Sequence, residues 1–232
     1  MKAMFEGKPM DKSIIPAQMR YLNIRPGSVF AAAKIMAPAK HMIGERVAGV
    51  LDRLTDVRLV RYNKYIMCLF IFPSHEGLAA LKKNLEDIVK SWKCSIGLSD
   101  CFENAYDMHT YALQAEKSVS LQKNKEPALS CYSQYALFDL IDAAADKKNV
   151  FCAFEIKKML EYDKNNSTEY TQTLKAFLEN EESPSETAYA LNIHRNTLSY
   201  RIERMRQLFY LDLESPENRY RYYLSILMTE EE

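Results

Sequence analysis

The chain has 232 residues, of which 47% are hydrophobic, and its 31 basic residues balance its 31 acidic residues. This composition excludes a disordered chain, and the length gives room for two domains. No apolar run approaches the roughly 20 residues of a membrane-spanning helix, and the N-terminus lacks the apolar segment of a signal peptide. We therefore expect a cytoplasmic protein with no membrane partner.

From residue 28 the chain alternates between strand-like and helix-like runs. Strand-like runs cover residues 28–37, 57–72 and 94–99, and helical spacing of apolar residues covers residues 41–54, 75–92 and 106–124. The middle strand-like run reads as a hairpin turning at Asn63 and Lys64, because Asn tolerates a positive φ. The order βαββαβ predicts an α+β domain over residues 28–132.

After the polar stretch "QKNKEP" and one short strand-like piece, "ALSCYS", the patterns are helical only. Two helices are expected to connect the domains over residues 133–165. The next helix begins near residue 167, with Ser167 or Thr168 as its N-cap, and a last helix opens at Ser215 and Pro216. The expected division is therefore an N-terminal segment or linker (1–27), the α+β domain (28–132), a helical connection (133–165) and an all-α domain (166–232).

The stretch "SPSETAYALNIHRNTLSYRIERM" predicts a helix-turn-helix. Ser185 is expected to cap a short helix over 186–191, with Ala188 small enough for close approach of a second helix. Asn192 follows where the tight turn requires a residue that tolerates a left-handed backbone. The second helix begins near Arg195. Its inward stripe consists of Leu198, Ile202, Met205 and Phe209.

Basic and polar residues gather on the opposite face of this second helix. Near its start, Arg195 and Asn196 are placed to read base edges in a major groove, where Arg pairs with guanine and Asn with adenine. His194, Thr197 and Arg201 are placed to contact phosphates, with Arg204 and Arg206 further along the helix. The predicted DNA-binding residues are His194, Arg195, Asn196, Thr197, Ser199, Tyr200, Arg201 and Arg204. The alternative is an amphipathic helix whose arginines are merely solvated.

The C-terminal residues resemble a specific family. The run "IHRNTLSYRI" (193–202), followed downstream by Asp212, Leu213, Pro216 and Arg219, resembles the helix-turn-helix signature of the PucR/CdaR (sugar diacid regulator) family. The resemblance implies a bacterial transcriptional regulator that binds double-stranded DNA. Residues from about 28 to 125 resemble, more weakly, the GGDEF-like domain found upstream in that family.

The chemistry of a GGDEF-type cyclase is missing from these residues. Such an enzyme needs a Gly-Gly-Asp/Glu-Glu-Phe turn and acidic residues that hold metal. The hairpin here reads "RYNKYI" (61–66), and Val29 to His41 contain no acidic residue. We therefore predict a degenerate GGDEF-like domain that is a scaffold or sensor, with no catalytic residues.

No metal or cofactor site is expected elsewhere in the chain. The glycines form neither a P-loop nor a G-x-G-x-x-G motif, and His41, His75 and His109 share no ligand spacing. The five cysteines are widely spaced without a C-x-x-C pair, which favours reduced thiols over disulfides or zinc. They are Cys68, Cys94, Cys101, Cys131 and Cys152.

The sequence says less about the oligomeric state and the effector than about the DNA-binding helix. One helix-turn-helix reads only a few base pairs, so we expect a homodimer, at least on DNA. The family usually carries an effector-sensing domain before the GGDEF-like part, whereas about 27 residues precede it here. Whether the chain is a fragment, and whether an unidentified small-molecule effector binds it, stay open. Two other functions also stay open: a ligand-sensing or interaction module whose helical tail binds a protein, and a residual nucleotide enzyme.

Overall fold

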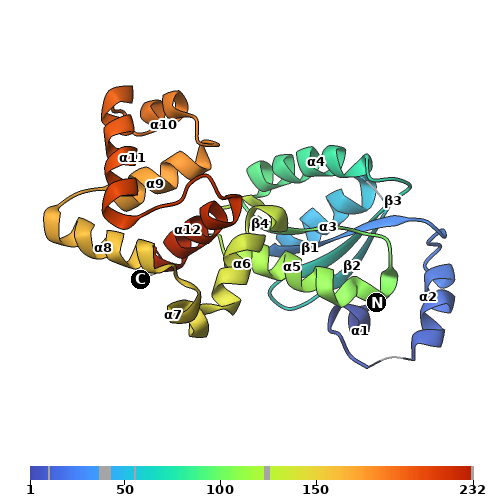
Figure 1. Ribbon diagram of the computed structural model, residues 1–232. Coiled ribbons are helices and arrows are strands. Elements are labelled where there is room, and N and C mark those ends of the chain that lie inside the picture. The colour runs from blue at the N-terminus through green and yellow to red at the C-terminus, as the bar shows by residue number, and fades with distance from the viewer. Residues whose placement is uncertain (10, 37–42, 55, 123–125, 231–232) are drawn as a thin grey trace. The chain divides into compact units, whose positions relative to one another are not determined.

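The computed structural model describes residues 1–9, 11–36, 43–54, 56–122 and 126–230 (Figure 1). The chain forms two compact units, Met1–Asp139 and Leu140–Glu232. The first unit contains helices α1 (Lys2–Phe5), α2 (Ile15–Tyr21), α3 (Ile43–Leu54), α4 (Gly77–Trp92) and α5 (Met108–Ser120), and strands β1 (Val29–Met36), β2 (Val57–Arg61), β3 (Ile66–Phe72), β4 (Ser95–Phe102) and β5 (Leu129–Cys131). Helix α6 (Ala136–Ala143) contains the boundary. The second unit continues with α7 (Lys148–Phe151), α8 (Phe154–Asn166), α9 (Tyr170–Glu179), α10 (Pro184–Ala190), α11 (Arg195–Phe209) and α12 (Pro216–Thr229).

The five strands form one mixed sheet in the order β2-β3-β1-β4-β5. Strand β1 is antiparallel to both β3 and β4, β2 is antiparallel to β3, and the short β5 runs parallel to β4. This arrangement confirms the predicted α+β class and the antiparallel hairpin in its middle.

Both faces of the sheet are covered, because side chains alternate along the strands. From β1, Ala31, Ala33 and Ile35 join the cluster formed with α3 and α4. Phe30 and Ala32 join the opposite cluster, formed with α5 and the N-terminal segment. Figure 1 shows α4 and α5 on opposite sides of the sheet. Burial on both faces explains why β3 is a continuous apolar run rather than an alternating one.

The N-terminal segment packs into the first unit. Met4, Phe5, Ile15 and Ile24 are buried in the cluster that α5 covers. The backbone carbonyl of Phe5 lies 2.8 Å from Nδ1 of His109 on α5. The short helices α1 and α2 thus extend the cover of the sheet.

The predicted hairpin turn occurs where expected, but its backbone differs from the prediction. Four residues, 62–65, separate β2 from β3, and the Tyr62 N–H donates to the Tyr65 carbonyl at 2.9 Å. Asn63 is not among the described residues with positive φ, so the expected left-handed conformation is wrong. Two-residue hairpin loops require positive φ, whereas four-residue loops can be built around a type I turn that does not.

The second unit has its own core. Residues of α8, α9, α11 and α12 form one buried cluster that includes Ile156, Leu174, Met205 and Ile226. The Ser225 hydroxyl on α12 accepts a hydrogen bond at 2.8 Å from the Ala153 N–H, just before α8. Helix α8 is therefore part of the scaffold that supports α11.

The histidines and cysteines of the first unit give no sign of a metal site or a disulfide among the described residues. His75 Nε2 lies 3.0 Å from Glu103 Oε1, and His41 lies outside the described residues. None of the five cysteines forms a disulfide among the described residues, and burial raises the pKa of Cys94 to about 11. In the described ranges, no three His, Cys, Asp or Glu side chains are grouped to hold a metal ion. No helix among those residues has the length and apolar character needed to cross a membrane.

Candidate nucleic-acid interface

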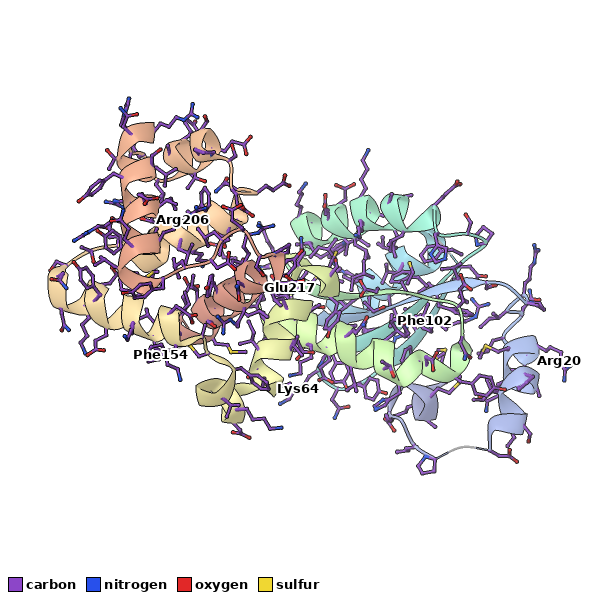
Figure 2. The ribbon with its side chains drawn as sticks, in the orientation of Figure 1. Arg20, Lys64, Phe102, Phe154, Arg206 and Glu217 are labelled. Atoms are coloured by element: carbon purple, nitrogen blue, oxygen red, sulfur yellow. The ribbon has the colours of Figure 1, made fainter. Side chains whose placement is uncertain are left out.

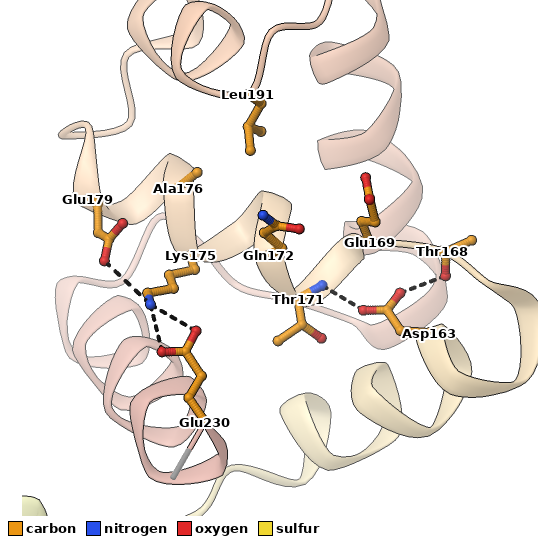
Figure 3. Close-up of a pocket in the computed structure, with 10 residues that line it drawn as sticks. All are labelled: Asp163, Thr168, Glu169, Thr171, Gln172, Lys175, Ala176, Glu179, Leu191 and Glu230. Carbon is orange, nitrogen blue, oxygen red and sulfur yellow. Dashed lines mark hydrogen bonds and ion pairs between the residues drawn. The ribbon is translucent and has the colours of Figure 1, made fainter. Parts of the chain in front are cut away.

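Helix α9 supports the interface, and its N-terminus is capped from the preceding helix. The Asp163 carboxylate accepts a hydrogen bond from the backbone N–H of Tyr170 at 2.9 Å. It accepts a second from the backbone N–H of Thr171 at 2.8 Å (Figure 3). It also accepts one from the Thr168 hydroxyl at 2.6 Å. The predicted cap by Ser167 or Thr168 is therefore wrong. Ser167 instead has a left-handed backbone, with φ of 51°, at the end of α8.

A pocket of about 540 Å³ opens beside α9 (Figure 3). Its charged lining residues are Asp163, Glu169, Glu179, Glu230 and a single cation, Lys175. Lys175 Nζ lies 2.6 Å from Glu230 Oε2 and 3.9 Å from Glu179 Oε1. The remaining negative charge disfavours phosphate groups, so this pocket is not the nucleic-acid surface.

Helix α10 begins two residues earlier than the sequence predicts, at Pro184. Ser183 is the N-cap, and its Oγ accepts a hydrogen bond from the Glu186 N–H at 3.5 Å. Pro184 occupies the first helical position, where its missing N–H costs nothing because that group would have no helical partner. The predicted cap by Ser185 is therefore wrong.

The turn between α10 and α11 follows the prediction closely. Asn192 has a left-handed backbone with φ of 53°. Ala188 is buried, and its carbonyl accepts a hydrogen bond from the Ile193 N–H at 3.0 Å. A small residue and a left-handed turn together bring α10 beside the start of α11, as Figure 1 shows.

Helix α11 presents one face to the core and one to solvent. His194 caps it, with Nδ1 accepting a hydrogen bond from the Asn196 N–H at 3.2 Å. Leu198, Met205 and Phe209 are buried, and Ile202 packs against the core cluster that contains Met205 and Phe209, which confirms the predicted stripe.

Most of the predicted DNA-binding residues lie on the solvent face. The exposed ones are His194, Arg195, Asn196, Thr197, Ser199, Tyr200 and Arg204. Within the described part of the chain, the guanidinium groups of Arg195 and Arg204 make no hydrogen bond or ion pair. This face therefore carries two uncompensated cations beside hydroxyl and amide groups, which can contact phosphates and base edges.

Two other arginines of α11 are engaged within the protein. Arg201 is half-buried, and its Nη1 donates to the hydroxyl of buried Thr173 on α9 at 3.0 Å. Arg206, which Figure 2 shows on α11, pairs with Glu214 at 3.0 Å. Sequence spacing gives no signal of these partners, because they come from other elements.

The segment after α11 is also built from polar contacts. Ser215 caps α12 and Pro216 occupies its first position, as predicted. The Asp212 carboxylate accepts hydrogen bonds from the N–H groups of Glu214 at 3.1 Å and Ser215 at 3.3 Å. The bond from Ser215, and then that from Glu214, lower the pKa of Asp212. Tyr222 on this helix is buried in the core of the second unit.

Comparison with known proteins identifies the C-terminal region. Residues 170–228 match the family model of the PucR C-terminal helix-turn-helix domain. The chain is 25% identical over 138 residues to the DNA-binding transcriptional activator AdeR of Bacillus subtilis (strain 168), covering 56% of this chain and 33% of that protein. It is 28% identical over 123 residues to the proline-responsive transcriptional activator PutR of the same organism, covering 52% and 30%. The chain thus spans about a third of the length of these curated relatives.

A solved structure of a regulator of polyketide synthase expression from Bifidobacterium adolescentis is also similar. It shares 16% identity and a TM-score of 0.44 over 99% of this chain and 90% of that one. The PucR part of the predicted resemblance is confirmed for the C-terminal domain by the family match. The GGDEF-like part stays a prediction.

Proposed function

We propose that this protein is a sequence-specific DNA-binding transcriptional regulator of the PucR type. The observation that carries the proposal is the exposed basic face of α11, held in a helix-turn-helix that matches the PucR C-terminal domain. The names of the two relatives, both transcriptional activators, support the same function.

In this proposal the start of α11 enters the major groove, where helix-turn-helix proteins contact base edges. Arg195 and Asn196 read bases, while Thr197, Ser199, Tyr200 and Arg204 contact phosphates or flanking bases. His194 contributes from the N-cap position. The Nη1 of Arg201 donates to Thr173 and to Glu169, which leaves the Nη2 and Nε donors of its guanidinium for a phosphate.

The test is binding to a duplex that the parent protein selects from a random pool, compared with a scrambled duplex at several salt concentrations. Arg195→Ala and Asn196→Ala should each cost about 1–3 kcal/mol on the selected duplex and relax preference at particular bases. Arg204→Ala should weaken binding to both duplexes alike and lower the salt slope by roughly one.

Lys164→Ala is the matched control, because Lys164 is an exposed cation on α8, away from the proposed face. It should leave the base preference unchanged. If folded Arg195→Ala and Asn196→Ala variants bind both duplexes as the parent does, α11 does not read bases. The interaction of the helical tail with a protein partner would then explain the exposed face better.

For the first unit we propose a non-enzymatic scaffold or sensor related to GGDEF-like domains, within a cytoplasmic protein. The βαββαβ order and a hairpin loop that lacks acidic residues support this assignment. The proposed division keeps the sequence boundaries at residues 28, 133 and 166, with an effector of unknown identity. Residues of the N-terminal segment and of α8 then pack into the cores of the first and second units, respectively. Incubation with GTP and Mg²⁺ should give no dinucleotide product, and clean protein that makes such a product would contradict the assignment.

We also propose that two copies bind DNA together. Large apolar side chains near the start of the second unit are exposed: Leu140 by 61%, Val150 by 80%, Phe151 by 52% and Phe154 by 66%. Phe154 stands at the start of α8 (Figure 2). Contiguous exposed apolar patches are typical of interaction surfaces, and we propose that these side chains contribute to one. Sedimentation should detect a dimer on DNA that Phe151→Ser with Phe154→Ser weakens, and a parent that stays monomeric on selected DNA would refute the homodimer.

A further inference from the structure

Arg219 on α12 joins two segments that flank the helix-turn-helix. Its Nη1 donates to the carbonyls of Leu213 at 2.7 Å and Glu214 at 3.2 Å, in the segment that leaves α11. Its Nε pairs with Glu182 Oε1 at 2.6 Å, in the loop that enters α10. One guanidinium therefore links the exit of α11 to the entry of α10.

The loop that carries Glu182 has an unusual backbone. Glu181 and Glu182 both have positive φ, 51° and 60°, which side-chain-bearing residues seldom adopt. The Glu182 N–H donates to the Phe177 carbonyl at 3.0 Å, and Ser183, the cap of α10, follows directly. A contact to Glu182 therefore acts on the first residues of α10.

We propose that Arg219 is a positioning residue that holds α10 in register with α11 for docking on DNA. This inference rests on the proposed DNA-binding function. In helix-turn-helix proteins the first helix crosses the phosphate backbone while the second lies in the groove, so both must be placed together. Arg219 fixes α10 at its start, the end opposite to the Asn192 turn.

The geometry distinguishes this role from a direct phosphate contact. The charge of Arg219 is paired with Glu182, and both side chains are partly buried. The guanidinium also donates two hydrogen bonds to carbonyls within the protein. A phosphate contact by Arg219 would add to the counterion release that sets the salt slope, whereas a positioning residue does not.

The decisive experiment compares Glu182→Gln with Glu181→Gln. Each removes one negative charge from adjacent residues of a unit that binds a polyanion, so electrostatics alone predicts equal or tighter binding for both. Glu181 is exposed and makes no hydrogen bond or ion pair among the described residues, so Glu181→Gln should follow that expectation. Glu182→Gln releases Arg219 and should weaken binding to the selected duplex by about threefold to tenfold, the range set by a net interaction of about 1 kcal/mol.

Arg219→Ala provides the second measurement. It should weaken binding to the selected duplex at every salt concentration while the salt slope stays unchanged, with circular dichroism showing that the variant is folded. Arg219→Lys keeps the positive charge but loses the planar guanidinium that donates to several groups at once. Its loss of affinity for the selected duplex should therefore be intermediate.

The outcomes distinguish a failure of the positioning role from a failure of the proposed DNA-binding function. If the parent selects no duplex from the pool, the proposed DNA-binding function fails and this inference fails with it. If the parent selects a duplex but Glu182→Gln binds as tightly as Glu181→Gln, the positioning role alone is refuted. A salt slope reduced by roughly one in Arg219→Ala would likewise refute it and assign Arg219 to a phosphate.

Discussion

The cap of α9 provides a direct test of how the second unit is stabilised. Asp163→Ala removes a carboxylate that accepts two backbone N–H bonds, at 2.9 and 2.8 Å, from the first turn of α9. Loss of an N-cap costs about 1 kcal/mol, within a range of about 0.5–2. Loss of a negative charge from a helix N-terminus adds about 0.3–1 kcal/mol. We therefore expect Asp163→Ala to lower the free energy of unfolding by about 2 kcal/mol.

Two further variants show whether the carboxylate is responsible. Asp163→Asn keeps one acceptor oxygen and should lose about 1 kcal/mol, because the charge and one of the two backbone bonds go. Thr168→Val removes only the hydroxyl that donates to Asp163 at 2.6 Å. Its cost should stay within about 1 kcal/mol, which is typical of a single hydrogen bond.

The assay is urea denaturation followed by circular dichroism, with hydrogen exchange of the Tyr170 and Thr171 amides as a local measure. In Asp163→Ala both amides should exchange faster than in the parent. If Thr168→Val costs as much stability as Asp163→Ala and Asp163→Ala leaves both amides protected, the cap comes from Thr168 and the structural reasoning is wrong.

Three other predictions concern packing and titration. A Cβ on Gly97 would lie 2.1 Å from the Ala115 carbonyl oxygen, so Gly97→Ala should destabilise the first unit by about 3 kcal/mol. Its control, Gly49→Ala, meets nothing within 4 Å on a helix and should stabilise by about 1 kcal/mol in the same denaturation assay. The pKa of Asp212 is lowered from 3.8, so its contribution to stability is complete above that value and is lost as the pH falls through the folded pKa. The difference in urea midpoint between the parent and Asp212→Asn should therefore narrow below about pH 4. Burial, and then the bond to Glu179, raise the pKa of Tyr223 from 10.0 to about 12. Its contribution to stability is therefore complete below pH 10 and is lost as the pH rises through about 12. Glu179→Gln should move the absorbance titration of Tyr223 to lower pH, and an unmoved titration would refute that contact.

The local sequence determined which elements form. Apolar spacing along the chain indicated the βαββαβ order and the inward stripe of α11, because both depend on residues a few positions apart. The Asn192 turn was predictable for a similar reason, since a left-handed backbone restricts the residue type at one position. The exposed basic face of α11 followed from the same periodicity.

Only the tertiary structure decided which polar groups meet. Asp163 caps a helix that begins seven residues later, Arg201 bonds to Thr173 on α9, and Arg219 bonds to Glu182 before α10. The burial of Met4 and Phe5 depends in the same way on packing beside α5, on the sheet face that this helix covers only in part. Periodicity records which side of an element faces the core, but a hydrogen bond requires two groups within about 3 Å. For groups on separate elements, that distance is fixed only when the helices and strands have packed together.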